Sequence, residues 1–258
     1  MEALNDLKIK FPAEDARVDQ DQEWFEVEKD GQCNRLRLHD YHKFFQYPGL
    51  YETVMVEHLK CKSPEVVCDM LCEHMEPWLS NQDQVHALDM GAGNGMVGEQ
   101  LKRHLDCETL VGVDIIPEAK MAAHRDRPGL YDHYCVADLT TEEGVGQLKK
   151  LDADFNLLIT VAALGYGDIP VNAFVNAFNL LDEGSLVAFN IKDRFLSDAD
   201  ETGYKHTIQG MCEGCINVLE SNRYRHRVSI SGDPLYYVAI VGEKLKQADP
   251  EECLADIA

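Results

Sequence analysis

Val85-His86-Ala87-Leu88-Asp89-Met90-Gly91-Ala92-Gly93-Asn94-Gly95-Met96-Val97-Gly98 is the stretch that decides the fold. An apolar run ends at Asp89, three glycines alternate from Gly91 to Gly95, and apolar residues then recur at helical spacing over 96–105. Glycine is needed where the backbone takes a positive φ or a ligand lies against it. A helix that begins just after a turn aims its free N–H groups at that turn. The stretch therefore predicts a strand, a tight ligand-binding turn and a helix.

Two motif frames compete for these glycines. Gly93, Gly95 and Gly98 satisfy the dinucleotide-binding spacing G-x-G-x-x-G. In the other frame, Asp89 and the glycines at 91, 93 and 95 form D-x-G-x-G-x-G. The second frame fits better, because the apolar strand ends just before Asp89 and the turn must then begin by residue 91. A glycine-rich turn with a purely structural role is the third interpretation.

The second frame resembles the cofactor motif of class I S-adenosylmethionine (SAM)-dependent methyltransferases, and the resemblance covers about residues 85–242. It implies a Rossmann-like sheet with SAM as the cofactor, held at this turn by Asp89, Gly91, Ala92, Gly93 and Gly95. The run 157–195 is similar to the Williams–Beuren critical-region methyltransferase-like group and to bacterial small-molecule methyltransferases. In that group Asn190 and Lys192 would face the pocket.

Acidic residues close two further predicted strands. The strand 109–113 ends in Asp114, which lies 21 residues beyond Gly93. An acid at the end of the second parallel strand can accept both ribose hydroxyls, of NAD or of SAM. Ile115 beside it is placed to pack on an adenine face. The strand 134–137 ends in Asp138, and the resemblance assigns the adenine amino group to Asp138 and a ring nitrogen to Leu139.

The second half of the chain predicts the rest of the sheet. Residues 155–160 are nearly all apolar, as in a central parallel strand. The small residues that follow from Val161 let a ligand come close, so we expect Val161 at the cofactor. After a mostly helical stretch over 198–220, strands 225–231 and 235–241 are joined by only three residues. A parallel crossover needs about a dozen residues, so this last pair is antiparallel.

The predicted fold is therefore α/β, a doubly wound, mostly parallel seven-stranded sheet with an antiparallel last strand, plus an N-terminal extension. Within the extension, alternating residues 24–28 and 33–38 flank Asp30-Gly31 and predict a β-hairpin. Helices are expected over 51–59 and 64–75, with Ser63 as an N-cap. We expect 1–80 to cap the substrate, 81–246 to bind SAM and 247–258 to form an acidic tail.

The proposed reaction is in-line transfer of the SAM methyl to an O, N or S atom of a small molecule, with a base where the acceptor carries a proton. Histidine suits proton acceptance near neutrality, and His42 lies in the aromatic stretch 39–49. It is the first candidate base, ahead of Tyr41, Tyr166 and His206. A carboxylate acceptor would need no base. The predicted substrate contacts are Tyr47, Tyr166, Asn190 and Lys192.

Composition and charge narrow the classes of function that remain. The 258 residues carry a formal charge of −22, which disfavours binding to nucleic acid. No apolar run reaches the roughly 20 residues of a membrane span. Nine cysteines, an odd number, suggest reduced thiols and a cytoplasmic protein, and we expect no metal site. The sequence leaves open whether two copies of the chain form a homodimer. An NAD-dependent oxidoreductase and a non-catalytic SAM-binding scaffold are the alternative functions.

Overall fold

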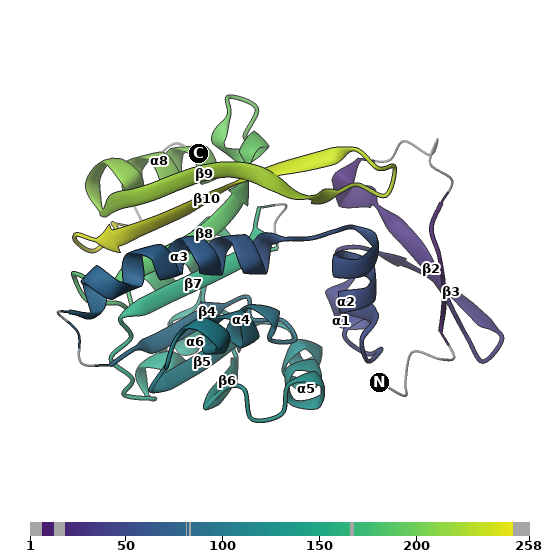
Figure 1. Ribbon diagram of the computed structural model, residues 1–258, viewed down its shortest axis with the longest axis horizontal. Helices are drawn as coiled ribbons and strands as arrows, with labels where there is room; N and C mark the ends of the chain where they lie inside the picture. The colour runs from purple at the N-terminus through teal and green to yellow at the C-terminus, as the bar shows by residue number, and fades with distance from the viewer. Residues whose placement is uncertain (1–6, 13–18, 81, 83, 166–167, 250–258) are drawn as a thin grey trace.

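The computed structural model describes residues 7–12, 19–80, 82, 84–165 and 168–249 (Figure 1). Its larger sheet has seven strands in the order β6-β5-β4-β7-β8-β10-β9. These strands are β4 (His86–Met90), β5 (Thr109–Asp114), β6 (His133–Val136), β7 (Leu157–Leu164), β8 (Leu186–Lys192), β9 (Ile216–Val228) and β10 (Pro234–Lys244). A second sheet of three strands lies at one end of the molecule.

Strand directions confirm the predicted doubly wound fold. β4 pairs in parallel with β5 and β7, and the ladder continues in parallel to β6 on one side and to β8 on the other. β10 runs antiparallel to both of its neighbours, β8 and β9. The carboxyl ends of β4, β5, β6 and β7 therefore meet at one edge of the sheet, where open α/β folds bind ligands.

β9 begins much earlier than the sequence predicts. Helix α8 (Tyr204–Gly214) ends before the strand starts at Ile216, whereas we expected helix to residue 220 and a strand only from Arg225. The whole strand pairs with β10, from Ile216 opposite Lys244 to Val228 opposite Pro234. β9 is an edge strand whose residues 217–225 are mostly exposed, so its sequence lacks the apolar alternation that marks a half-buried strand.

Helices cover both faces of the larger sheet. They are α3 (Ser63–Leu79), α4 (Met96–His104), α5 (Pro117–Asp126), α6 (Glu142–Lys149), α7 (Val171–Phe178) and α8. Successive residues of a strand point to opposite faces, and Leu158 packs with α7 and α8 while Ile159 packs with α3 and α4. Within the described residues, no helix combines the length and the apolar character that crossing a membrane requires.

The N-terminal region forms a small body with its own core. β1 (Lys8–Lys10), β2 (Trp24–Lys29) and β3 (Gln32–Arg37) pair antiparallel, which confirms the hairpin and adds β1, a strand that the sequence did not predict. Two short helices, α1 (Tyr41–Phe44) and α2 (Leu50–Glu52), and a π-helical turn (Thr53–His58) follow. We call residues 24–59 the cap. Figure 1 shows α1 and α2 between the hairpin and the larger sheet.

Ser63 does not cap α3 as predicted. Lys62 occupies the N-cap position, and the Ser63 hydroxyl instead lies 2.6 Å from Nδ1 of His226 and 2.5 Å from the hydroxyl of Tyr224. Ser63 is fully buried against the sheet, so its hydroxyl satisfies these buried polar groups. Helix α3 itself packs on the large sheet through Leu71.

Candidate functional site

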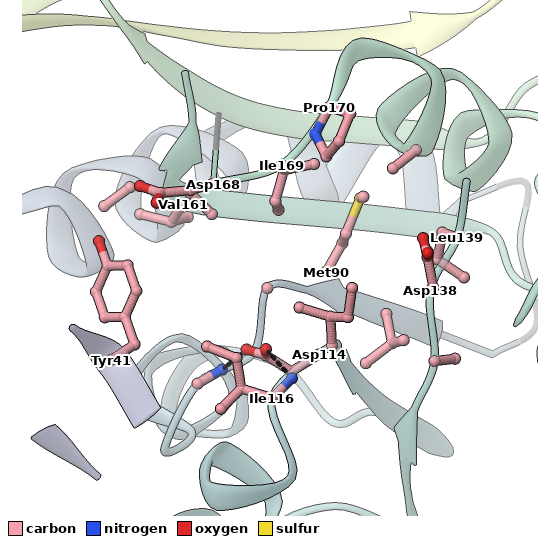
Figure 2. Close-up of a pocket in the computed structure, with 18 of the residues that line it drawn as sticks. Tyr41, Met90, Asp114, Ile116, Asp138, Leu139, Val161, Asp168, Ile169 and Pro170 are labelled. Carbon is pink, nitrogen blue, oxygen red and sulfur yellow. Dashed lines mark hydrogen bonds between the residues drawn. The ribbon is translucent and has the colours of Figure 1, made fainter. Parts of the chain in front are cut away.

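A cavity of about 310 Å³ opens at the carboxyl edge of the parallel strands (Figure 2). Its walls come from the glycine turn, from the ends of β5, β6 and β7, and from the cap. The polar or aromatic residues among them are His39, Tyr41, Phe45, Tyr51, Asp114, Asp138 and Asp168. The fold thus brings the predicted strand ends together at one site.

The glycine turn needs its glycines. Gly91, Gly93 and Gly95 all have positive φ, at +71°, +53° and +92°. A Cβ on Gly91 would lie 2.9 Å from the Cβ of Ala163 on the facing wall, closer than carbon atoms approach. Gly91 belongs only to the D-x-G-x-G-x-G frame, so its conformation and its place in the cavity wall favour that frame.

Asp114 is held in place by the turn beside it. Its Oδ2 accepts a 3.0 Å hydrogen bond from the Gly93 amide, and its Oδ1 accepts one of 3.0 Å from the Ile116 amide (Figure 2). Burial raises the pKa of Asp114, and these backbone donors counteract that rise. A carboxylate has about four lone-pair sites, so it can accept further hydrogen bonds from a ligand.

Asp138 lies across the cavity, at the end of β6. Its Oδ1 accepts hydrogen bonds from the hydroxyl and the amide of Thr140, at 2.7 and 2.9 Å. The Thr140 hydroxyl lowers the pKa of Asp138, so the side chain is an anion at neutral pH. Leu139 lines the same end of the cavity (Figure 2).

Asp89 lies behind the glycine turn and not in the cavity wall. It is fully buried, and its Oδ2 accepts a 2.7 Å hydrogen bond from the Tyr131 hydroxyl. Burial raises the pKa of Asp89 to about 7. Ala92 and Gly95 also lie outside the wall. The predicted cofactor residues that do line the cavity are Gly91, Gly93, Asp114, Ile115, Asp138, Leu139 and Val161.

The cap closes one end of the cavity with aromatic rings. The ring of Tyr41 lies 5.8 Å from that of His39 and 6.3 Å from that of Phe45. The Nδ1 of His39 lies 2.9 Å from Oδ2 of Asp168, which follows β7. This pair therefore joins the cap to the sheet. We had not predicted either residue, although His39 begins the aromatic stretch 39–49 that holds His42, and Asp168 follows the small residues after Val161.

The predicted bases are scattered in the structure. His42 is exposed on α1 and His206 is exposed on α8, and neither lines the cavity. Tyr41 does line it, but burial raises the pKa of Tyr41 well above 10, so its hydroxyl keeps its proton at neutral pH. Tyr166 lies outside the described residues.

Three of the predicted substrate contacts, Tyr47, Asn190 and Lys192, also lie away from the cavity. Asn190 is fully buried behind the wall, because Phe189 and Ile191 face α7 and α8 and strand alternation turns Asn190 to the other side. The expectation that it faces the pocket is therefore wrong. Lys192 is half-buried and does not line the cavity, and burial lowers its pKa. Tyr47 packs within the cap, where the Lys29 ammonium lies 5.9 Å from its ring centroid.

Solved structures share this fold. No protein-family profile matches the chain, and neither does any curated protein. The chain is similar to the N-methyltransferase NodS from Bradyrhizobium japonicum in complex with S-adenosyl-L-homocysteine, with 14% identity, a TM-score of 0.52 and coverage of 80% of this chain and 97% of that one.

A SAM-dependent methyltransferase from Anabaena variabilis is similar at 11% identity, with a TM-score of 0.50 and coverage of 81% of this chain and 96% of that one. At such identities the likeness concerns the fold. The narrower resemblance to the Williams–Beuren group stays a prediction. The chain has the fold of the class I SAM-dependent methyltransferases.

Proposed function

We propose that this protein is a SAM-dependent methyltransferase that transfers a methyl group to an O, N or S atom of a small molecule. The observation that carries the proposal is Asp114, whose carboxylate is oriented at the cavity by the Gly93 amide of the glycine turn. An acid fixed at this point, beside a turn of glycines with positive φ, is suited to a ribose. The two structures compared above are named methyltransferases, which agrees with this function.

The cavity fits an adenosyl cofactor. Asp114 would accept from the ribose hydroxyls, while Ile115, Asp138 and Leu139 would hold the adenine at the far end. Gly91 and Gly93 line the cavity with backbone that carries no side chain, as a ligand lying on the backbone requires. SAM would supply a methyl group already activated by its sulfonium, so the protein has to hold the acceptor in line.

The position of the cap favours a small molecule as the methyl acceptor. Its rings close the cavity beside the SAM site, and we propose that the cap acts as a lid over the substrate. A formal charge of −22 opposes a nucleic-acid substrate. The eight cysteines within the described residues are free thiols, which agrees with our proposal of a cytoplasmic location.

Ligand-induced stabilisation tests the function without knowledge of the acceptor. A ligand that binds only the folded state raises the free energy of unfolding by about 2.7 kcal/mol at a hundred times its Kd. We expect S-adenosylhomocysteine to raise the melting temperature in proportion to the logarithm of its concentration. NADH, at the same concentrations, should leave the melting temperature unchanged. A shift with NADH alone would identify the cavity as a dinucleotide site instead.

A further inference from the structure

We propose that the methyl acceptor is an amine, which Asp168 binds as the ammonium ion and His39 deprotonates. This inference rests on the proposed methyltransferase function and identifies the substrate class of the same cavity. It assigns roles to two residues that the sequence did not indicate.

The cavity has two distinct ends (Figure 2). Asp138 and Leu139 lie at one end, Tyr41 and Asp168 lie at the other, and Asp114 lies between them. If the adenosine occupies the first end and the middle, the methionine part of SAM and the acceptor meet at the second. The groups that the acceptor meets there are a carboxylate, an imidazole and the rings of the cap.

The charge of the cavity selects a cation. Its walls carry three carboxylates, Asp114, Asp138 and Asp168, and within the described part of the chain no lysine or arginine lines them. An acidic acceptor would meet like charge at short range, whereas an ammonium ion would pair with Asp168. The rings of Tyr41 and Phe45 add cation–π attraction for a cation that approaches their faces.

The contact between His39 and Asp168 supplies the proton acceptor that an amine requires. An ammonium nitrogen has no lone pair, so it must lose a proton before it can attack. Asp168 holds the His39 ring through Nδ1 at 2.9 Å, and a carboxylate has enough lone-pair sites to bind the ammonium as well. Both side chains are largely shielded from water, with exposed fractions of 17% and 25%.

The step balances in atoms and charge. The ammonium ion gives one proton to His39, and the nitrogen lone pair of the neutral amine then attacks the methyl carbon. The carbon–sulfur bond breaks, and its electron pair stays on sulfur as a neutral thioether. The methylated nitrogen carries the positive charge that left the sulfonium, and His39 returns its proton to solvent.

A matched acceptor library tests the substrate class. The protein is incubated with saturating SAM and a set of carbon skeletons, each offered as a primary or secondary amine, an alcohol or phenol, and a carboxylic acid. Mass spectrometry then identifies the methylated products. We expect products from amines only. Products from alcohols, phenols or acids would overturn the proposal, and so would no product from any class in a protein that binds S-adenosylhomocysteine. Failure to bind S-adenosylhomocysteine would instead refute the methyltransferase function.

Two variants test the assigned roles against the best amine. Asp168→Asn should raise KM about tenfold or more while the affinity for S-adenosylhomocysteine changes less than twofold, and Asp168→Glu should recover part of the loss. His39→Ala should lower kcat about 100-fold, and added imidazole should restore part of it, because a free base can replace a missing catalytic one. His133→Gln, an exposed histidine at the start of β6, is the matched control. If imidazole did not rescue His39→Ala and Asp168→Asn kept the wild-type KM, both assigned roles would be refuted.

Discussion

Asn190 of β8 supports Ala162 of β7 through a hydrogen bond of 2.6 Å, donated by the Ala162 amide to the Asn190 Oδ1. Ala162 has a φ of +55°, in the left-handed region that favours glycine, at a point where the regular pairing of β7 with β8 is interrupted. The Asn190 amide also donates to Ser63 and to the Tyr224 hydroxyl. Because Ala162 lines the cavity, this buried contact fixes the shape of the wall.

Replacement of Asn190 by alanine should therefore cost both stability and ligand affinity. The change leaves the Ala162 amide without its buried acceptor, whereas the Ser63 and Tyr224 hydroxyls lose the Asn190 donor but keep their contact with each other. An unpaired buried group costs about 1–3 kcal/mol. We therefore expect urea denaturation to show a loss of about 1–3 kcal/mol, with weaker S-adenosylhomocysteine binding. Ala162→Gly is the matched control, because it relieves the positive φ and should leave stability equal or slightly higher. Unchanged stability in Asn190→Ala would show that the contact does not hold the wall.

Gly91→Ala should block the cofactor site. The new Cβ would lie 2.9 Å from the Cβ of Ala163 and 3.1 Å from Cδ1 of Ile169, both in the cavity wall. Gly129→Ala is the matched control. The φ of Gly129, +73°, is close to the +71° of Gly91, but nothing lies within 4 Å of its Cβ position. Both variants carry the same backbone strain. Calorimetry should show at least a tenfold loss of S-adenosylhomocysteine affinity in Gly91→Ala alone; equal losses would point to strain and not to the site.

Asp114→Ala should weaken S-adenosylhomocysteine binding by tenfold or more. The variant removes the ribose acceptor, and it also releases the Gly93 and Ile116 amides that the carboxylate now holds. Asp106→Asn removes an exposed acid outside this cavity and should bind normally. If calorimetry showed wild-type affinity in Asp114→Ala, Asp114 would not bind the ribose, and the proposed function would lose the observation that carries it.

Asp89 should make stability depend on pH. Its pKa of about 7 in the folded state exceeds the value near 3.9 of an unfolded chain, so the folded state binds the proton more tightly between these values. Its contribution to stability is therefore present below pH 4 and is lost as pH rises to 7, with a slope of up to about 1.4 kcal/mol per pH unit. Asp89→Asn should lack this slope, so its stability relative to wild type should rise between pH 5 and 7. If the stabilities of wild type and Asp89→Asn changed by the same amount between pH 5 and 7, the raised pKa of Asp89 would be contradicted.

The sequence predicted which strand ends line the cavity, for a physical reason. A strand that ends in an acid beside glycines is a local pattern, and the parallel sheet automatically places such ends at one edge. Gly91, Asp114 and Asp138 accordingly line the cavity. Asp89 satisfied the same pattern but points behind the turn, toward Tyr131, because neighbouring residues of a strand face opposite sides.

The contact between His39 and Asp168 could not be predicted in the same way. His39 and Asp168 are 129 residues apart, and only the folded cap brings them within 2.9 Å of each other. His42, three residues from His39, has the same chemistry but is exposed on α1. Asn190 was placed at the pocket by the resemblance to a family. Its contact with Ala162 instead follows from the interrupted pairing of β7 with β8, a feature that no sequence pattern of this chain marks.

The most direct measurement is calorimetric titration of the purified protein with S-adenosylhomocysteine, with NADH titrated in parallel. Our account predicts one site per chain with micromolar affinity for S-adenosylhomocysteine and no heat of binding with NADH. Binding of NADH alone, or of neither ligand, would contradict the claim that the cavity beside Asp114 is a SAM site.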